Sequence, residues 1–159
     1  MFAIVKTKLL KLCLNPVFLA CVFSWFSAQF IKTIINLGFR RIHTISELLE
    51  MLIWKTGGFP SSHTALVTSL CTSVAFRNGL DSDIFMLSAC LMMITIRDAL
   101  GVRRANGIHA RKINEMGREL NEKQIIEYKP IKEVLGHNPM EVVVGALLGF
   151  FIGLAFSTL

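Results

Sequence analysis

Residues 57–64 read Gly-Gly-Phe-Pro-Ser-Ser-His-Thr and stand directly before an apolar run that begins at Ala65. Glycine permits a tight turn, proline fixes one backbone dihedral, and Ser61 or Ser62 can cap the helix that the apolar run predicts. Unpaired backbone N–H groups at the start of a helix attract anions, and the hydroxyls and the His63 imidazole would add donors. The stretch indicates a phosphate site, although taken alone an ordinary helix cap is the simpler interpretation.

The composition is that of an integral membrane protein. Hydrophobic residues make up 53% and charged residues 18% of the 159 residues, and the mean hydropathy is +0.56, which is too apolar for a typical soluble domain. We predict an all-α integral membrane helical bundle that forms a single domain over residues 1–159, because no low-complexity linker divides it. The basic N-terminus resembles a secretory signal, but no small-residue cleavage site follows its apolar segment, so a retained membrane helix is expected.

Four apolar stretches predict about four transmembrane helices, because one crossing needs ~20 residues. They cover residues 12–35, Ser61 to about Gly79, 84–96 with an extension to 101, and 142–159. A short interfacial helix is predicted over residues 45–54, and an amphipathic helix over residues 107–123 lies within a long basic excursion at 102–136. The second and third spans are short, either because neighbouring helices shield them or because their ends lie in the interface.

Two features of the spans allow two interpretations each. Lys32, near the end of the first span, either snorkels to the interface or takes part in a polar site. Gly145, Gly149 and Gly153 recur at every fourth residue of the last span. They make a smooth stripe that would serve either packing inside the bundle or a homodimer. The four cysteines lie in apolar runs without metal-ligand spacing and indicate no disulfide framework.

The start of the last span contains a second candidate group of site residues. Residues 136–141 read Gly-His-Asn-Pro-Met-Glu, which places Glu141 one helical turn after His137. A carboxylate in that position fixes the tautomer of the imidazole, so His137 could serve as a nucleophile or a base. The alternative is that His137 is a capping residue and Glu141 a favourable charge at a helix N-terminus. Four crossings would bring this segment, the 57–64 loop and the basic excursion to one side of the membrane.

The distribution of charge indicates the partners and the orientation. The formal net charge is +6, and the arginines and lysines concentrate in the two loops that would carry the site. Membrane lipid and a phosphorylated lipid substrate fit this charge, whereas no nucleic-acid-binding motif is present. The positive-inside rule favours a cytoplasmic-facing site in the cytoplasmic membrane, although Lys6, Lys8 and Lys11 favour the opposite orientation.

Several motifs occur in an order that resembles a known superfamily. They are Asn15-Pro16, Gln29 with Lys32, residues 57–63, Asp98-Ala99-Leu100-Gly101-Val102-Arg103-Arg104, and residues 136–142. Together they resemble the divergent, membrane-embedded branch of the type 2 phosphatidic acid phosphatase superfamily, which is related to acid phosphatases and vanadium-dependent haloperoxidases. The likeness spans nearly the whole chain, and the ordered set of motifs is its basis.

The resemblance implies that His137 attacks phosphorus to form a phosphohistidine, with Glu141 in the place of the usual orienting Asp. His63 would then protonate the leaving alkoxide. The groups implied to hold the phosphate oxygens are cations and hydroxyls, namely Lys32, Ser61, Ser62 and one or more arginines. No cofactor or metal is implied, because two histidines supply the nucleophile and the acid and the cations match the charge of the phosphoryl group.

The chain departs from the usual pattern of the superfamily at three positions, which are Ser62 in place of Gly, Glu141 in place of Asp, and Ile131 in place of Arg. Arg103 or Arg104 could replace the missing arginine, and Asp98 could orient one of them. The first prediction is therefore metal-independent hydrolysis of a lipid phosphomonoester or a polyprenyl pyrophosphate. The alternative is a non-catalytic membrane protein that binds anionic lipid headgroups through a degenerate phosphate pocket.

Overall fold

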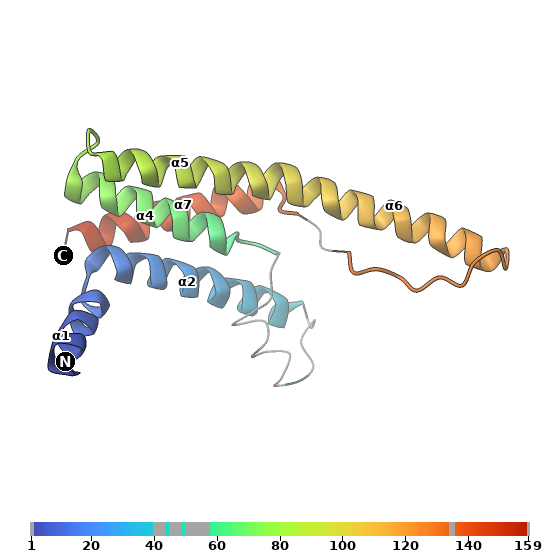
Figure 1. Cartoon of the computed structure of the whole chain (residues 1–159), viewed down its shortest axis with the longest axis horizontal. Coiled ribbons are helices and arrows are strands. Elements are labelled where there is room, and N and C mark those ends of the chain that lie inside the picture. Colours follow the sequence, from blue (N-terminus) through green and yellow to red (C-terminus); the bar gives the residue numbers. More distant parts are fainter. Residues whose placement is uncertain (1, 40–43, 45–48, 50–57, 134–135, 159) are drawn as a thin grey trace.

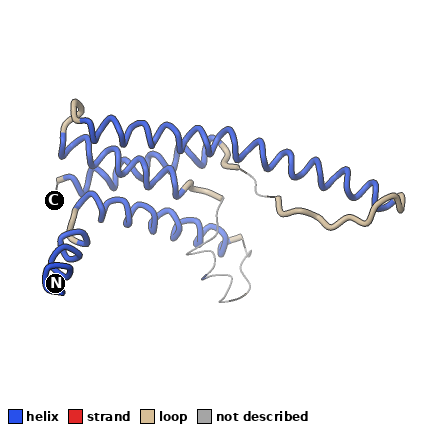
Figure 2. The backbone as a smooth tube through the Cα atoms, in the orientation of Figure 1, coloured by secondary structure: helices blue, strands red, loops and turns tan. Residues whose placement is uncertain are grey.

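The computed structural model describes residues 2–39, 44, 49, 58–133 and 136–158. Every regular element among these residues is a helix, as Figure 2 shows, so the predicted all-α fold is confirmed. The elements are α1 (Phe2–Cys13), α2 (Pro16–Gly38), α4 (Ser62–Asn78), α5 (Asp83–Arg97), the π-helical turn η1 (Asp98–Val102), α6 (Arg103–Glu122) and α7 (Pro139–Ser157). The interfacial helix predicted over residues 45–54 falls, apart from residue 49, outside the described residues.

α2 begins about one turn later than the predicted first span. The Asn15 side chain caps it by accepting hydrogen bonds from the backbone N–H groups of Val17, at 2.9 Å, and Phe18, at 3.3 Å. Pro16 follows as the first helical residue, where proline is well tolerated. The prediction of a span from residue 12 is therefore wrong at its N-terminal end, because Asn15-Pro16 interrupts the apolar run. The residues before it form the separate helix α1.

α4 lies at the centre of the bundle, packed against α2, α5 and α7 (Figure 1). Many of its buried residues carry hydroxyl groups, and two of the serines bond to backbone carbonyls within the bundle. Ser69 Oγ donates to the carbonyl oxygen of Leu66 at 2.9 Å, and Ser73 Oγ donates to that of Gly153 at 3.2 Å. The second predicted span is thus short and polar because neighbouring helices shield it. α5 differs, since Ser88 is its one buried residue.

Three helical segments among the described residues are long and apolar enough to cross a bilayer. They are α2, the continuous helix Asp83–Glu122 and α7. α4, the predicted second span, has 17 residues and is not among them. It nevertheless runs alongside the spanning helices within the bundle (Figure 1). The predicted helical membrane bundle is confirmed, with α4 as its shielded inner member.

α5, η1 and α6 form one continuous helix of 40 residues, Asp83–Glu122. At 1.5 Å per residue it is about 60 Å long, roughly twice the thickness of the apolar part of a bilayer. Its second half, α6, extends well past the end of the bundle (Figure 1). The amphipathic helix predicted over residues 107–123 is therefore present. It begins earlier, at Arg103, because the backbone continues through the π-helical turn.

The chain returns along α6 through residues 123–133, held by the buried side chain of Asn114. Its Nδ2 donates to the carbonyl oxygen of Ile131 and its Oδ1 accepts from the backbone N–H of Ile131, both at 2.9 Å. The Tyr128 hydroxyl also donates to Asn114 Oδ1, and the Tyr128 ring lies against Gly117. The return segment precedes Gly136 and His137, so α6 supports the stretch of chain that leads into α7.

The glycine stripe of α7 packs against the backbone of α4. A Cβ atom would lie 2.4 Å from the carbonyl oxygen of Ser61 if added at Gly145, 2.1 Å from that of Ala65 at Gly149, and 2.7 Å from that of Ser69 at Gly153. Of the two interpretations of this stripe, the structure shows packing inside the bundle. A homodimer through the same three glycines would require α4 to leave α7.

Replacing Gly149 by alanine should therefore destabilise the bundle. The new methyl group would overlap the carbonyl of Ala65, and overpacking of this kind costs about 1–3 kcal/mol. Gly38→Ala is the matched control, because none of the described residues has an atom within 4 Å of its added Cβ. Thermal unfolding of the detergent-solubilised variants, followed by circular dichroism, should show a lower Tm for Gly149→Ala alone. Equal Tm values for the two variants would contradict the packing.

Candidate functional site

The predicted site residues converge at one end of the bundle. The last turns of α2, the start of α4, the turn η1 with the start of α6, and the start of α7 all lie at this end (Figure 1). The two chain termini lie toward the opposite end (Figure 1). The expectation that the 57–64 loop and the start of the last span share one side of the membrane agrees with this arrangement.

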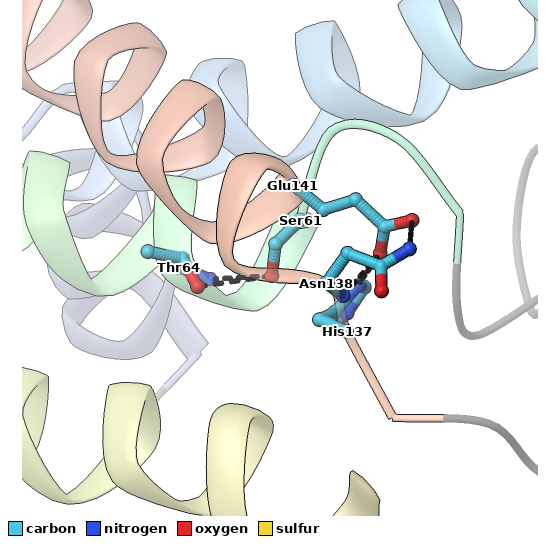
Figure 3. Close-up of polar contacts among 5 residues, drawn as sticks. All are labelled: Ser61, Thr64, His137, Asn138 and Glu141. Atoms are coloured by element: carbon cyan, nitrogen blue, oxygen red, sulfur yellow. Dashed lines mark hydrogen bonds and ion pairs between the residues drawn. The ribbon is translucent and has the colours of Figure 1, made fainter.

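His137 and Glu141 form a close pair at the start of α7. His137 Nδ1 lies 2.7 Å from Glu141 Oε2, and His137 is only 6% exposed. The same carboxylate oxygen accepts the backbone N–H of Asn138, the N-cap residue of α7, at 3.3 Å (Figure 3). A carboxylate on Nδ1 leaves Nε2 as the nitrogen available for chemistry. The sequence prediction that one helical turn would bring these two side chains together is confirmed.

The 57–64 loop is tied to α7 by its backbone. The N–H of Ser61 donates to the carbonyl oxygen of Glu141 at 2.9 Å. Ser61 caps α4, and its Oγ lies 2.9 Å from Thr64 Oγ1 and accepts the Thr64 N–H at 3.4 Å (Figure 3). Both Ser61 and Ser62 are buried. The contacts of Ser61 show that its structural role is to cap α4. Sequence reasoning foresaw this cap but had no signal for the backbone bond to Glu141.

A second close contact joins the start of α7 to the start of α6. A Cβ atom added at Gly136 would lie 2.3 Å from the backbone nitrogen of Arg104 and 2.7 Å from the carbonyl carbon of Arg103. Only glycine allows this approach, because any side chain would displace the backbone of α6. Gly136 therefore places the chain before His137 against the start of α6. α6 begins here with Arg103 and Arg104. These are the two arginines that were expected to replace the arginine missing from the superfamily pattern.

Several charged or titratable side chains of the site lie around His63. It is exposed in the first turn of α4. Arg103, His137, Lys32 and Asp98 all lie within electrostatic range of its imidazole. Four segments distant in the sequence therefore bring charged or titratable groups to one place, and two of these groups, Lys32 and Arg103, are cationic. Both cations would attract a bound anion.

Arg103 is paired with Asp98 across the π-helical turn. Its Nε lies 2.5 Å from Asp98 Oδ2, and both side chains remain partly exposed. The sequence predicted that Asp98 would orient Arg103 or Arg104, and the structure shows the pair with Arg103. Arg104 is exposed and contributes its backbone to the contact with Gly136. The π-helical turn itself was not predicted; such turns inside α-helices often occur at functional sites.

Lys32 is buried at this end of α2, which excludes the interpretation that it snorkels to the interface. It is 1% exposed, and among the described residues its Nζ has no hydrogen-bond partner. Glu141 lies within electrostatic range of it, and Gly58 lies beside its aliphatic stem, where an added Cβ would be 3.6 Å from Lys32 Cγ. A buried ammonium group without a partner is energetically costly unless something binds it. Because it also lies within electrostatic range of His63, this ammonium group is a candidate ligand for an anion.

Comparisons with known proteins show the family of the chain. The sequence model of a family described as "Divergent PAP2 family" matches residues 13–152. The chain is also similar to the "Uncharacterized membrane protein YuiD" of Bacillus subtilis (strain 168), with 43% identity over 117 residues, which cover 67% of this chain and 74% of that protein. No solved structure matches the chain. The family match covers the segments that carry every candidate site residue.

Proposed function

Since this chain belongs to the divergent PAP2 family, we propose that it hydrolyses a phosphorylated membrane lipid at the His63–His137 end of the bundle. The observation that carries the proposal is the buried Lys32 ammonium, which lacks a hydrogen-bond partner among the described residues and lies within electrostatic range of both His63 and Glu141. A phosphate group would supply the missing acceptor. Placement in a membrane protein favours a lipid phosphomonoester or a polyprenyl pyrophosphate over a soluble substrate.

In the proposed reaction His137 is the nucleophile and Glu141 its orienting partner. Nε2 of His137 attacks phosphorus, the bond from phosphorus to the lipid oxygen breaks, and His63 gives that oxygen a proton. A water molecule then attacks phosphorus, the bond from phosphorus to Nε2 breaks, and His63 takes up a proton from the water. Phosphate leaves, and both histidines return to their starting states.

The cations stabilise the charge on the transferring phosphoryl group. Lys32 is fixed by its burial, so it needs little reorganisation when phosphate binds. Arg103 is held by Asp98 at the same end of the bundle, and Arg104 follows it in the first turn of α6. The peptide N–H groups at the start of α4, beside Ser61 and Ser62, would complete the phosphate site. In this proposal the basic residues at the site end of the bundle favour a cytoplasmic-facing site.

Binding without hydrolysis is the second candidate function, and two contacts favour it. The Ser61 hydroxyl is engaged in capping α4, and Arg103 is engaged with Asp98. Both groups would otherwise be donors for a transition state. A protein with these donors occupied can hold an anionic lipid headgroup through Lys32 and the basic start of α6. The two functions differ in whether His137 becomes phosphorylated.

Release of phosphate by the purified protein tests the proposal. We expect turnover of phosphatidic acid, phosphatidylglycerophosphate or a polyprenyl pyrophosphate in mixed micelles containing EDTA. Glu141→Gln should reduce turnover by about 10²–10⁴-fold, because the amide cannot stabilise the cationic imidazole. Glu115→Gln is the control, since Glu115 pairs with Arg111 and Lys112 on the exposed surface of α6. Equal turnover by the two variants would exclude the proposed role of Glu141.

A further inference from the structure

α1 is amphipathic and lies outside the proposed site. Val5, Leu9 and Leu12 recur at the spacing of one helical face and are 50–59% exposed. At about 100° per residue, Lys11 projects from the side of the helix opposite Leu9, and Lys8 and Lys6 lie on the two flanks of the apolar face. The helix contains three lysines and no acidic residue. Its apolar face is therefore uncovered by the described part of the chain, and every charged residue of the helix is a lysine.

The position of α1 in the fold indicates what covers this face. α2 is long and apolar enough to cross a bilayer and begins at Pro16, so α1, which ends at Cys13, lies at the edge of the membrane. Figure 1 shows α1 turning away from the direction of α2, across the axis of the bundle, at the end opposite the site. A helix in this place and direction lies along the membrane surface.

We propose that α1 binds the surface of the bilayer on the side opposite the site, with a preference for anionic lipids. Val5, Leu9 and Leu12 enter the boundary between headgroups and acyl chains, and Lys11 faces the anionic headgroups. Lys6 and Lys8, on the flanks of the apolar face, reach the headgroups by extending their stems. This surface is separate from the proposed hydrolysis and does not depend on it.

A second copy of the chain is a poorer occupant of the same face. Two α1 helices packed together would bring six lysines into proximity without a carboxylate on either helix. Like charges at such a contact repel each other. A leaflet that contains anionic lipids has the complementary charge, and the connection to α2 holds α1 next to the bilayer. The lipid surface is therefore the occupant that both the charge and the position favour.

Depth measurements with spin labels test this inference in the full chain. In a background with the four native cysteines replaced by alanine, Leu9→Cys and Lys11→Cys each carry a nitroxide, and the protein is reconstituted in vesicles of phosphatidylcholine and phosphatidylglycerol in equal parts. The label at Leu9 should collide mainly with oxygen, which enters the bilayer, and the label at Lys11 mainly with a water-soluble nickel complex. Replacing Lys6 and Lys8 by glutamine should shift the Leu9 label toward water.

Vesicles of phosphatidylcholine alone separate the two parts of the inference. There the Leu9 label should give the same depth with and without the Lys6 and Lys8 substitutions, because no anionic headgroup remains. Equal exposure of both labels to nickel in the mixed vesicles would overturn membrane binding. Spectral broadening from a neighbouring nitroxide would assign the face to a second copy instead. If the depth of the Leu9 label changes neither with the lipid composition nor with the lysine substitutions, the preference for anionic lipids is overturned.

Discussion

His137→Ala should abolish hydrolysis of lipid phosphate, with a loss on the order of 10⁴-fold or more, because removal of a nucleophile leaves only the contribution of the binding groups. The buried imidazole is held by Glu141 at 2.7 Å, and α7 contains no histidine that could replace it. Release of phosphate from labelled phosphatidic acid in detergent micelles measures the effect. Brief reaction followed by alkaline quenching should also trap a phosphoenzyme in the unaltered protein and none in the variant.

A matched substitution separates chemistry from folding in that experiment. His109 is exposed on α6 and belongs to no part of the site, so His109→Ala should retain full turnover. The Tm of His137→Ala should remain close to that of the unaltered protein, since the Glu141 carboxylate keeps its bond from the Asn138 N–H. Undiminished hydrolysis by folded His137→Ala would exclude His137 as the nucleophile. Headgroup binding by the unaltered protein without any hydrolysis would favour the second candidate function.

The sequence was sufficient to predict the pairing of His137 with Glu141 at the start of α7. It also predicted that the starts of α4 and α7 lie on the same side of the membrane. His137 and Glu141 are one helical turn apart, so local geometry alone brings them together. The capping of α4 by Ser61 is also local, and it is present. The convergence of the two segments followed from counting membrane crossings, which is a topological argument and requires no detail of packing. These features were predictable because each depends on short-range geometry or on hydropathy.

Other features depend on contacts that no local pattern encodes. The close approach of Gly136 to the start of α6 and the bond from Ser61 N–H to the Glu141 carbonyl join segments more than 30 residues apart. A continuous helix through Asp98–Val102 was not predicted, because the polar residues after that turn resembled the beginning of a loop. Asn15-Pro16 did carry a readable signal, a cap followed by proline, and the long apolar run obscured it. Burial of Lys32 could not be decided from hydropathy, since a snorkelling lysine has the same sequence context.

Lys32→Met should change stability and anion binding in opposite directions. Methionine removes a buried ammonium group that has no hydrogen-bond partner among the described residues, and it keeps most of the packing of the stem beside Gly58. The free energy of unfolding should therefore rise by about 1–4 kcal/mol. Loss of a charge-assisted hydrogen bond should weaken binding of phosphate or vanadate by roughly 10- to 100-fold. A residue kept only for packing would not produce both effects.

Thermal unfolding with and without vanadate distinguishes the two contributions. Vanadate is a suitable probe because it adopts the geometry of a phosphoryl group under attack. Saturating vanadate should raise the Tm of the unaltered protein by binding the folded state, and it should raise that of Lys32→Met much less. Lys112→Met is the control, because Lys112 is exposed on α6, where it pairs with Glu115, and the response to vanadate should be unchanged. A Lys32→Met protein that unfolds earlier than the unaltered protein and still responds fully to vanadate would show that the ammonium is satisfied within the bundle, and Lys32 would then have no part in holding the phosphate.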